Sequence, residues 1–285
     1  MTMFQIVRIS DEGSSSEFVA RLMFGVLQLR EEAIRRLWPG PEFQAHRDKF
    51  DERYDAVLAA VRTARKAALD LEQLVAQHTV KVESGEIVTV QQHAVSFSEG
   101  IDSAIHDYVG RVLTQGVIAL KALQAVTKIF GIEIGSVFQK QVSFERGMNR
   151  LQTAGHGALA AYLRAARSAW TESFISQRTA VEHDGWVAPR VRYEMTSPGR
   201  YTPVTPSICG SPAAEFGRLS VRRLQAFVEN VVVYAMSTSA SGVLILVEIP
   251  RAERRQEVAV RFKNALVGGG IPPWRPTYSD DDFLT

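Results

Sequence analysis

The chain has a single cysteine and lacks long apolar runs, and both absences limit what it can be. Because Cys209 stands alone among 285 residues, a disulfide, a CxxC redox pair or a thiolate zinc cluster cannot form within one chain. The most apolar stretches, VENVVVYAM (228–236) and GVLILVEIP (242–250), are too short and too interrupted to span a bilayer. The N-terminus also lacks the basic start and apolar segment of a secretory signal. These features predict a soluble, cytoplasmic protein without contact to a membrane.

Charge of one sign and the common nucleotide and hydrolase motifs are also missing. The 33 basic and 31 acidic side chains leave a formal charge of +2, so a large uniform field is not expected and any anion site must be local. The chain contains no G-x-x-x-x-G-K-[ST] loop, and no G-x-G-x-x-G placed between a strand and a helix. It also contains no H-E-x-x-H and no G-x-S-x-G. We therefore expect no P-loop, no zinc or nucleophile-elbow hydrolase, and no bound cofactor or metal.

What the sequence does contain is a series of long amphipathic segments. Apolar residues at spacings of three and four predict long helices over about 14–38, 42–78, 98–130, 159–183 and 219–234, and a short helix within 144–157. Ser14 and Glu17 have the spacing of a capping box for the first helix. VKVESGEIVTV alternates around Ser84 and Gly85, which predicts a small hairpin or a folded-back loop there. An irregular crossover with five prolines follows at 186–215, with VRYEM (191–195) as a strand inside it; GVLILVEIP is a second strand, before a Gly/Pro-rich tail.

This pattern predicts a mainly all-α fold, an antiparallel bundle of long helices with short hairpin or strand segments and an irregular Pro/Gly-rich crossover. The absence of a repeat of 20 to 50 residues argues against a helical solenoid. We divide the chain into an N-terminal helical segment (1–92), a helical bundle (93–240) and a C-terminal strand with its tail (241–285). The three are expected to pack as one globular unit.

Two groups of residues suggest chemistry only weakly. Asp102 and His106 lie four apart on one helix face and are a possible pair of metal ligands, but nothing obvious supplies a third ligand, so a hydrogen-bonded pair is the favoured interpretation. Ser207, Cys209 and Ser211 are possible nucleophiles in the crossover. No histidine lies near them in the sequence, so turn formation or packing is the default expectation.

The stretch FISQRTAVEHDGW (174–186) is more specific, because Arg178 and His183 stand at the end of a predicted long helix. At 100° per residue, Arg178 lies about 60° from the apolar stripe that Val181 continues, and His183 points nearly opposite Val181. One straight helix should therefore not aim both side chains at one small target. Either the helix unwinds near Gly185 and turns His183 round, or a symmetric dimer brings two copies together. In the structural alternative, Arg178 forms a salt bridge and His183 caps the last carbonyls.

A second pair, Arg150 and His156, has five residues between its members. It straddles a glycine-rich break and does not sit at a helix end, so we rank it well below the first pair.

With RTAVEH at the end of a core helix, the chain resembles the HEPN superfamily, the "higher eukaryotes and prokaryotes nucleotide-binding" domains. Members of that family are bundles of four or five helices, with an Arg followed by four to six residues and a His near the end of a core helix. Here Arg178 and His183 match the motif, and Thr179 replaces the Asn, Asp or His that often follows the Arg. The resemblance covers roughly residues 97 to 238.

The resemblance implies metal-independent RNA cleavage in a composite site of a homodimer. Its catalytic residues would be Arg178 and His183, and Thr179, Glu182 and Asp184 would be possible auxiliary residues. The family includes toxins and antiphage defence effectors, some of them restrained by a nucleotidyltransferase or another antitoxin. The alternative function is a non-catalytic HEPN-like helical bundle that binds a protein or a nucleotide.

Overall fold

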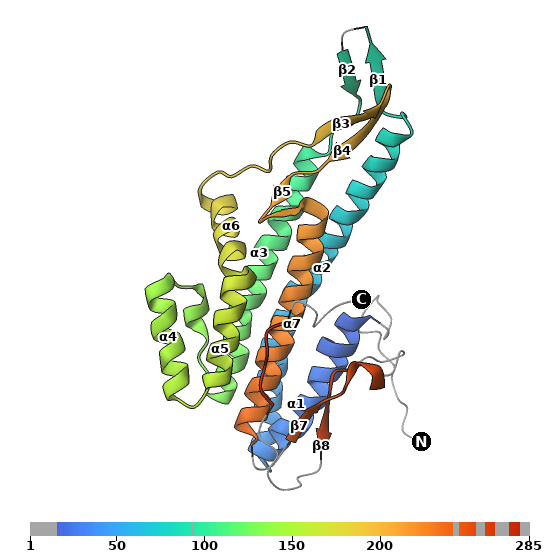
Figure 1. The fold of residues 1–285 in the computed structure, drawn as a ribbon. Helices are drawn as coiled ribbons and strands as arrows, with labels where there is room; N and C mark the ends of the chain where they lie inside the picture. Colours follow the sequence, from blue (N-terminus) through green and yellow to red (C-terminus); the bar gives the residue numbers. More distant parts are fainter. Residues whose placement is uncertain (1–15, 93, 242–244, 255–259, 266–273, 280–285) are drawn as a thin grey trace, which may run out of the picture.

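The computed structural model describes residues 16–92, 94–241, 245–254, 260–265 and 274–279. This part of the chain is mainly helical, and its strands form four two-stranded antiparallel sheets (Figure 1). The helical segments are η1 (Phe18–Gly25), α1 (Val26–Leu37), α2 (Glu42–Glu83), α3 (Asp102–Thr127), η2 (Lys128–Phe130), η3 (Gly135–Phe138), α4 (Gln141–Thr153), α5 (Gly157–Ala166), η4 (Arg167–Thr171), α6 (Glu172–His183), α7 (Ala213–Ser239) and η5 (Arg251–Glu253). The strand pairs are β1 (Val88–Gln91) with β2 (Ala94–Phe97), β3 (Arg192–Ser197) with β4 (Arg200–Val204), β5 (Ser207–Ile208) with β6 (Ser211–Pro212), and β7 (Ile245–Glu248) with β8 (Phe262–Ala265).

Three long helices, α2, α3 and α7, lie side by side and form the body of the molecule (Figure 1). The segment α5–η4–α6 lies against α3, and α4 packs on α5. The hairpin β1–β2 extends past one end of the long helices and β3–β4 lies against that end of α2, whereas α1 and the β7–β8 hairpin lie beside the other half of α7. One apolar core runs from η1 through the long helices to β8.

Helix α7 is the centre of this core. Every residue from Leu224 to Ser237 is buried, which is the behaviour of a helix that is apolar on all sides and surrounded by other elements. By contrast, α2 buries only one stripe, which includes Phe50, Tyr54 and Leu71. The difference follows from the sequence, because charged residues interrupt α2 at regular intervals and are rare in the second half of α7.

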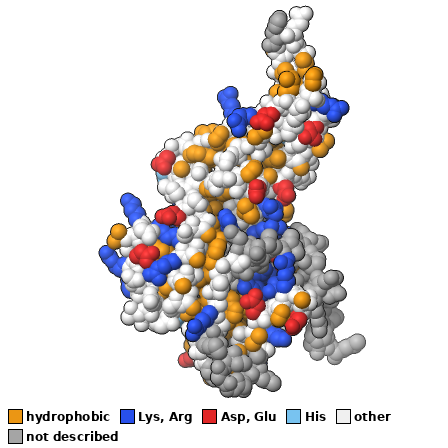
Figure 2. Space-filling model, viewed as in Figure 1, with side chains coloured by type: hydrophobic (Ala, Val, Ile, Leu, Met, Phe, Trp, Pro, Cys, Tyr) orange, Lys and Arg blue, Asp and Glu red, His pale blue; other side chains and the backbone are white. Residues whose placement is uncertain are grey.

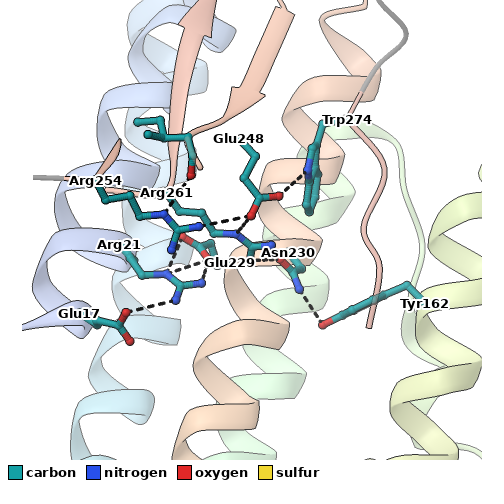
Figure 3. Close-up of polar contacts among 10 residues, drawn as sticks. Glu17, Arg21, Tyr162, Glu229, Asn230, Glu248, Arg254, Arg261 and Trp274 are labelled. Carbon is teal, nitrogen blue, oxygen red and sulfur yellow. Dashed lines mark hydrogen bonds and ion pairs between the residues drawn. The ribbon is translucent and has the colours of Figure 1, made fainter. Parts of the chain in front are cut away.

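Two buried polar residues of α7, Glu229 and Asn230, belong to a network of ion pairs and hydrogen bonds (Figure 3). The Arg21 side chain donates from Nε to both carboxylate oxygens of Glu229, at 3.2 and 3.1 Å. Arg261 donates from Nη1 to Glu229 Oε2 at 3.2 Å and to Asn230 Oδ1 at 2.8 Å, and Asn230 Nδ2 donates to the Tyr162 hydroxyl at 3.2 Å. Arg21 and Glu229 are 0% and 1% exposed. A buried charge is tolerated only when it is paired in this way.

The same network attaches the β7–β8 hairpin to the body of the protein. Arg261 donates from Nε to Glu248 Oε1 at 2.8 Å, and Trp274 donates from Nε1 to Glu248 Oε2 at 3.2 Å. Burial acts to raise the pKa of Glu248, but the hydrogen bond and positive charge of Arg261 outweigh it and lower that pKa. Glu248 is therefore held as the carboxylate that both donors require.

The expected mainly helical fold is confirmed, and most of the expected helices have close counterparts. The helix expected over 98–130 is α3 with η2, and Gly131 ends it with a φ of +74°. The strand VRYEM is found as part of β3, and GVLILVEIP contains β7. The capping box at Ser14 lies outside the described residues, as does all of the tail except 274–279. By length and composition alone, the segment 102–130 could cross a membrane; half of its most apolar window is buried inside the protein, and a core helix has the same properties.

Of the two alternatives for the segment around Ser84 and Gly85, the hairpin is wrong. Helix α2 continues to Glu83, and Gly85, with a φ of +79°, ends it. The valines that suggested a strand lie in the last turns of α2. Val82 faces the core and is 1% exposed, whereas Val80 faces outward and is 65% exposed. The hairpin begins later, at Val88. The sequence pattern also did not predict β4 and β8. Each pairs with the strand before it, across a turn or loop that has little apolar pattern.

Candidate functional site

Helix α6 carries the Arg178–His183 motif, and Gly116 of α3 allows it to lie close. A Cβ added to Gly116 would be 2.5 Å from the Phe174 ring, so no larger residue fits without movement. At Gly110, an added Cβ would meet Val181 at an ordinary 3.8 Å. The sequence pattern placed Phe174 and Val181 on one apolar stripe, and the structure shows α3 as the surface that this stripe covers.

The helix stays regular through His183 and then reverses. Gly185 has a φ of +66°, which a residue without Cβ adopts readily. The N–H groups of Asp184 and Trp186 both donate to the carbonyl of Ala180 at 3.1 Å. The expected unwinding that would turn His183 round is therefore not present, because the change of direction begins one residue later.

Glu182 joins the two residues of the motif. Its Oε2 forms an ion pair with Nη2 of Arg178 and lies 3.8 Å from Nε2 of His183. Its Oε1 accepts a hydrogen bond from the Thr114 hydroxyl of α3 at 3.3 Å. We expected that one straight helix could not aim both side chains at a small target. That expectation is wrong for the carboxylate of Glu182, because the side chains of Arg178 and His183 both approach its Oε2 atom.

The three side chains differ in exposure, which decides how each can act. The side chains of Arg178 and Glu182 are 21% and 26% exposed, whereas that of His183 is 64% exposed. The salt bridge of the structural alternative is thus present for Arg178. The capping role is not observed for His183, because in the described part of the chain its ring makes no hydrogen bond to a carbonyl.

Of the auxiliary candidates, only Glu182 belongs to the cluster. The Thr179 hydroxyl donates to the Ile175 carbonyl of its own helix at 3.0 Å. Asp184 is exposed at the end of α6. Its backbone N–H donates to the Ala180 carbonyl and so completes the last turn of the helix.

A shallow depression of about 390 Å³ borders this cluster on the α3 side. It is lined by His106, Asp107, Gly110, Arg111, Thr114 and Gln115. Thr114 is the link, because it lines the depression and also contacts the carboxylate between Arg178 and His183. Figure 2 shows basic, acidic and apolar side chains interspersed on one face of the protein, which agrees with the expectation that an anion site would be local.

Asp102 and His106 hold the chain that follows the motif. Asp102 Oδ1 accepts a hydrogen bond from the Val191 N–H at 2.7 Å, and His106 Nδ1 accepts one from the Ala188 N–H at 3.3 Å. The His106 ring also stacks on Trp186, with a centroid distance of 5.8 Å. The described residues contain no group of three or more His, Cys, Asp or Glu that could hold a metal ion. The hydrogen-bonded interpretation of this pair is the one that the contacts support.

The crossover nucleophiles form a turn. Cys209 has a φ of +48° and, with Gly210, connects β5 to β6. Its thiol lies 3.8 Å from the Ser173 carbonyl, and burial raises the pKa of that thiol, which favours the less reactive protonated form. The turn interpretation of this segment fits these contacts.

Comparison with protein-family models, with curated proteins and with solved structures finds no match to this chain.

Proposed function

We propose that the protein is a metal-independent endoribonuclease of the HEPN type, with an antiparallel helical bundle that presents Arg178 and His183 to RNA. One observation carries the proposal: the Oε2 atom of Glu182 marks a point that both side chains reach. A phosphate oxygen is also an anionic acceptor, and it can take the place of that carboxylate oxygen. Arg178 and His183 would then contact one phosphodiester from the same side of α6.

The chemistry of the two side chains suits cleavage by transesterification. His183 accepts the proton of the ribose 2′-hydroxyl while O2′ attacks the adjacent phosphorus. The new O2′–P bond forms, the P–O5′ bond breaks, and a proton is delivered to O5′. The products are a 2′,3′-cyclic phosphate and a free 5′-hydroxyl. Arg178 stabilises the charge that develops on the phosphorus oxygens. DNA lacks the 2′-hydroxyl, so the substrate class is RNA.

A homodimer supplies the second proton-transfer group that this reaction needs. One His183 would have to act as base and then as acid, whereas two copies of the chain divide these tasks. The high exposure of His183 is compatible with a shared cleft, because its ring is free to face a second copy. A cytoplasmic toxin or antiphage effector, restrained by a nucleotidyltransferase or another antitoxin, is the biological setting that the family resemblance suggests.

In this proposal, Glu182 competes with RNA for Arg178. An i,i+4 ion pair between partly exposed side chains contributes only about 0.3–0.5 kcal/mol, so a phosphodiester can displace it. We therefore expect Glu182→Gln to bind RNA about twofold more tightly than the unaltered protein.

The proposal is tested with a mixed RNA pool in the presence of a metal chelator. The unaltered protein should cleave it, and Arg178→Ala and His183→Ala should lose cleavage while they keep their far-UV circular dichroism. Arg146→Ala, on the exposed face of α4, and Ser176→Ala, on the exposed face of α6, are the matched controls and should retain it. Equal cleavage by the unaltered protein and both site variants, or cleavage by none, would refute the proposal.

The second candidate is a non-catalytic HEPN-like bundle that binds a protein or a nucleotide. It is favoured by the pairing of Arg178 with Glu182 within one helix, an ordinary stabilising contact of helix surfaces. This candidate predicts a monomer in light scattering and no cleavage of RNA by any variant.

A further inference from the structure

A second hollow lies at the far end of the α5–η4–α6 segment, away from the Arg178 cluster. It has a volume of about 390 Å³ and lies between α4 and the loop that follows η2. Its polar lining is made by Glu133, Ser136, Gln139, Arg150 and His156. From residue 157 to residue 183 the chain forms continuous helix, which at about 1.5 Å per residue separates the two sites by roughly 40 Å.

The glycine-rich break brings Arg150 and His156 to the same hollow. Gly155 has a φ of +89°, and its N–H donates to the Gln152 carbonyl at 3.1 Å. The N–H of His156 then donates to the Leu151 carbonyl at 2.8 Å. This pair of bonds is the Schellman ending of a helix, which folds the chain back over its last turn. Although the pair straddles the break, the reversal returns His156 to the level of Arg150, and both residues line the hollow.

The His156 ring has a defined hydrogen-bonding role. Its Nδ1 lies 3.2 Å from the Tyr234 hydroxyl. Burial raises the pKa of Tyr234, and a hydrogen bond from Thr238 to the phenolic oxygen partly offsets this. Burial lowers the pKa of His156, which favours the neutral ring, and a neutral ring offers one N–H donor.

Arg150 supplies the charge of the hollow. It is exposed, and none of the described acidic side chains forms an ion pair with it. Glu133 is the acidic residue of the lining. Its Oε1 lies 3.8 Å from Nζ of Lys128, a residue that does not line the hollow. Gly147 also lines the space; a Cβ there would lie 2.1 Å from Ser136 Oγ, so this glycine allows η3 to pack closely on α4.

We propose that this hollow binds a small molecule that carries a phosphate monoester. The planar guanidinium of Arg150 contacts two phosphate oxygens, and the neutral His156 ring and the Gln139 amide donate to the remaining acceptors. A volume of about 390 Å³ is in the range of small-molecule sites, where a few polar groups fix the orientation of the ligand. The site is independent of the proposed RNA cleavage, because neither Arg178 nor His183 takes part in it.

The test is a calorimetric titration of the full-length protein with inorganic phosphate, at constant ionic strength in chloride buffer. We expect saturable binding, and a loss of at least about tenfold in affinity in Arg150→Ala, since a hydrogen-bonded charge is removed. Arg146→Ala, one turn earlier on α4, should bind phosphate as the unaltered protein does, and Arg178→Ala distinguishes this hollow from the α6 cluster. A parallel titration with acetate should show weaker binding than phosphate.

Four outcomes would overturn the proposal: no binding of phosphate by the unaltered protein, equal affinity in Arg150→Ala, stronger binding of acetate, or loss of binding in Arg178→Ala. The last outcome would place the phosphate at the α6 cluster. Because Arg150 is exposed, its replacement should leave the urea midpoint unchanged, and that measurement separates lost binding from lost folding.

Discussion

Replacing Gly116 with alanine will weaken the packing of α6 on α3, and with it the support of the Arg178 cluster. The new Cβ would lie 2.5 Å from Cζ and 2.7 Å from Cε1 of Phe174, whereas carbon atoms in contact are about 3.5–4.0 Å apart. The ring would have to move by about 1 Å or more. It cannot do so freely, because Phe174 is 3% exposed and packs against Trp170 and Phe216, with ring centroids 5.6 and 6.4 Å away.

The size of the effect follows from two opposing terms. Overpacking of a well-filled core costs about 1–3 kcal/mol, and replacing a helical glycine by alanine contributes about 1 kcal/mol of stability. Gly110→Ala is the matched control on the same helix, because its Cβ would meet Val181 at an ordinary 3.8 Å. Both variants gain the same helix propensity from replacing glycine by alanine. Gly116→Ala should therefore be about 1–3 kcal/mol less stable than Gly110→Ala.

Urea unfolding followed by far-UV circular dichroism measures this difference directly. Adding Phe174→Leu to Gly116→Ala should recover part of the loss, since the smaller side chain makes room for the new methyl group. If the two alanine variants had the same free energy of unfolding, α6 would not lie against α3 as described, and the site built on that contact would be wrong.

Three further predictions concern the elements around the site. Asp102→Ala should lose about 1–2 kcal/mol of stability by urea unfolding, because the Val191 N–H loses its acceptor; Asp102→Asn, which keeps an acceptor oxygen, should lose less, and equal losses would contradict this role. Glu229→Ala leaves two buried arginines without their carboxylate and should cost about 3–5 kcal/mol in the same assay; a loss below about 1 kcal/mol would show that the pairing is not formed. Burial lowers the pKa of both His78 and His156 in the folded protein. As the pH falls, these residues therefore bind protons in the unfolded chain first, and the free energy of unfolding should decrease below about pH 6.5. The double variant with Asn at both positions should show a smaller decrease between neutral and mildly acidic pH.

The parts of the fold that the sequence predicts are those set by local apolar periodicity. The stripe of α3 and the stripe of α6 follow from residues three and four apart, and so do their buried faces. The position of Arg178 at a helix end follows in the same way, as does the stop at Gly185. The error at Ser84 arises because alternating valines suit a strand as well as the last turn of a helix with one buried face.

The sequence did not predict contacts between residues that are far apart in the chain. The partners of Asp102 and His106 are backbone N–H groups 89 and 82 positions away, and Arg21 meets Glu229 across 208 positions. No local pattern specifies such a pairing. The convergence of Arg150 and His156 did have a local signal, since a glycine just past a helix end is typical of a reversal, but the sequence alone does not say what lines the space beyond it.

The most direct test of the central claim compares one RNA oligonucleotide with its counterpart in which every 2′-hydroxyl is methylated. Both are incubated with the unaltered protein and with His183→Ala, in the presence of a chelator, and the ends of the products are identified by mass spectrometry. We expect the unaltered protein to cleave only the RNA with free 2′-hydroxyls, leaving 2′,3′-cyclic phosphates, and His183→Ala to cleave neither strand. Cleavage of the methylated strand, products with other ends, or undiminished cleavage by His183→Ala would contradict it.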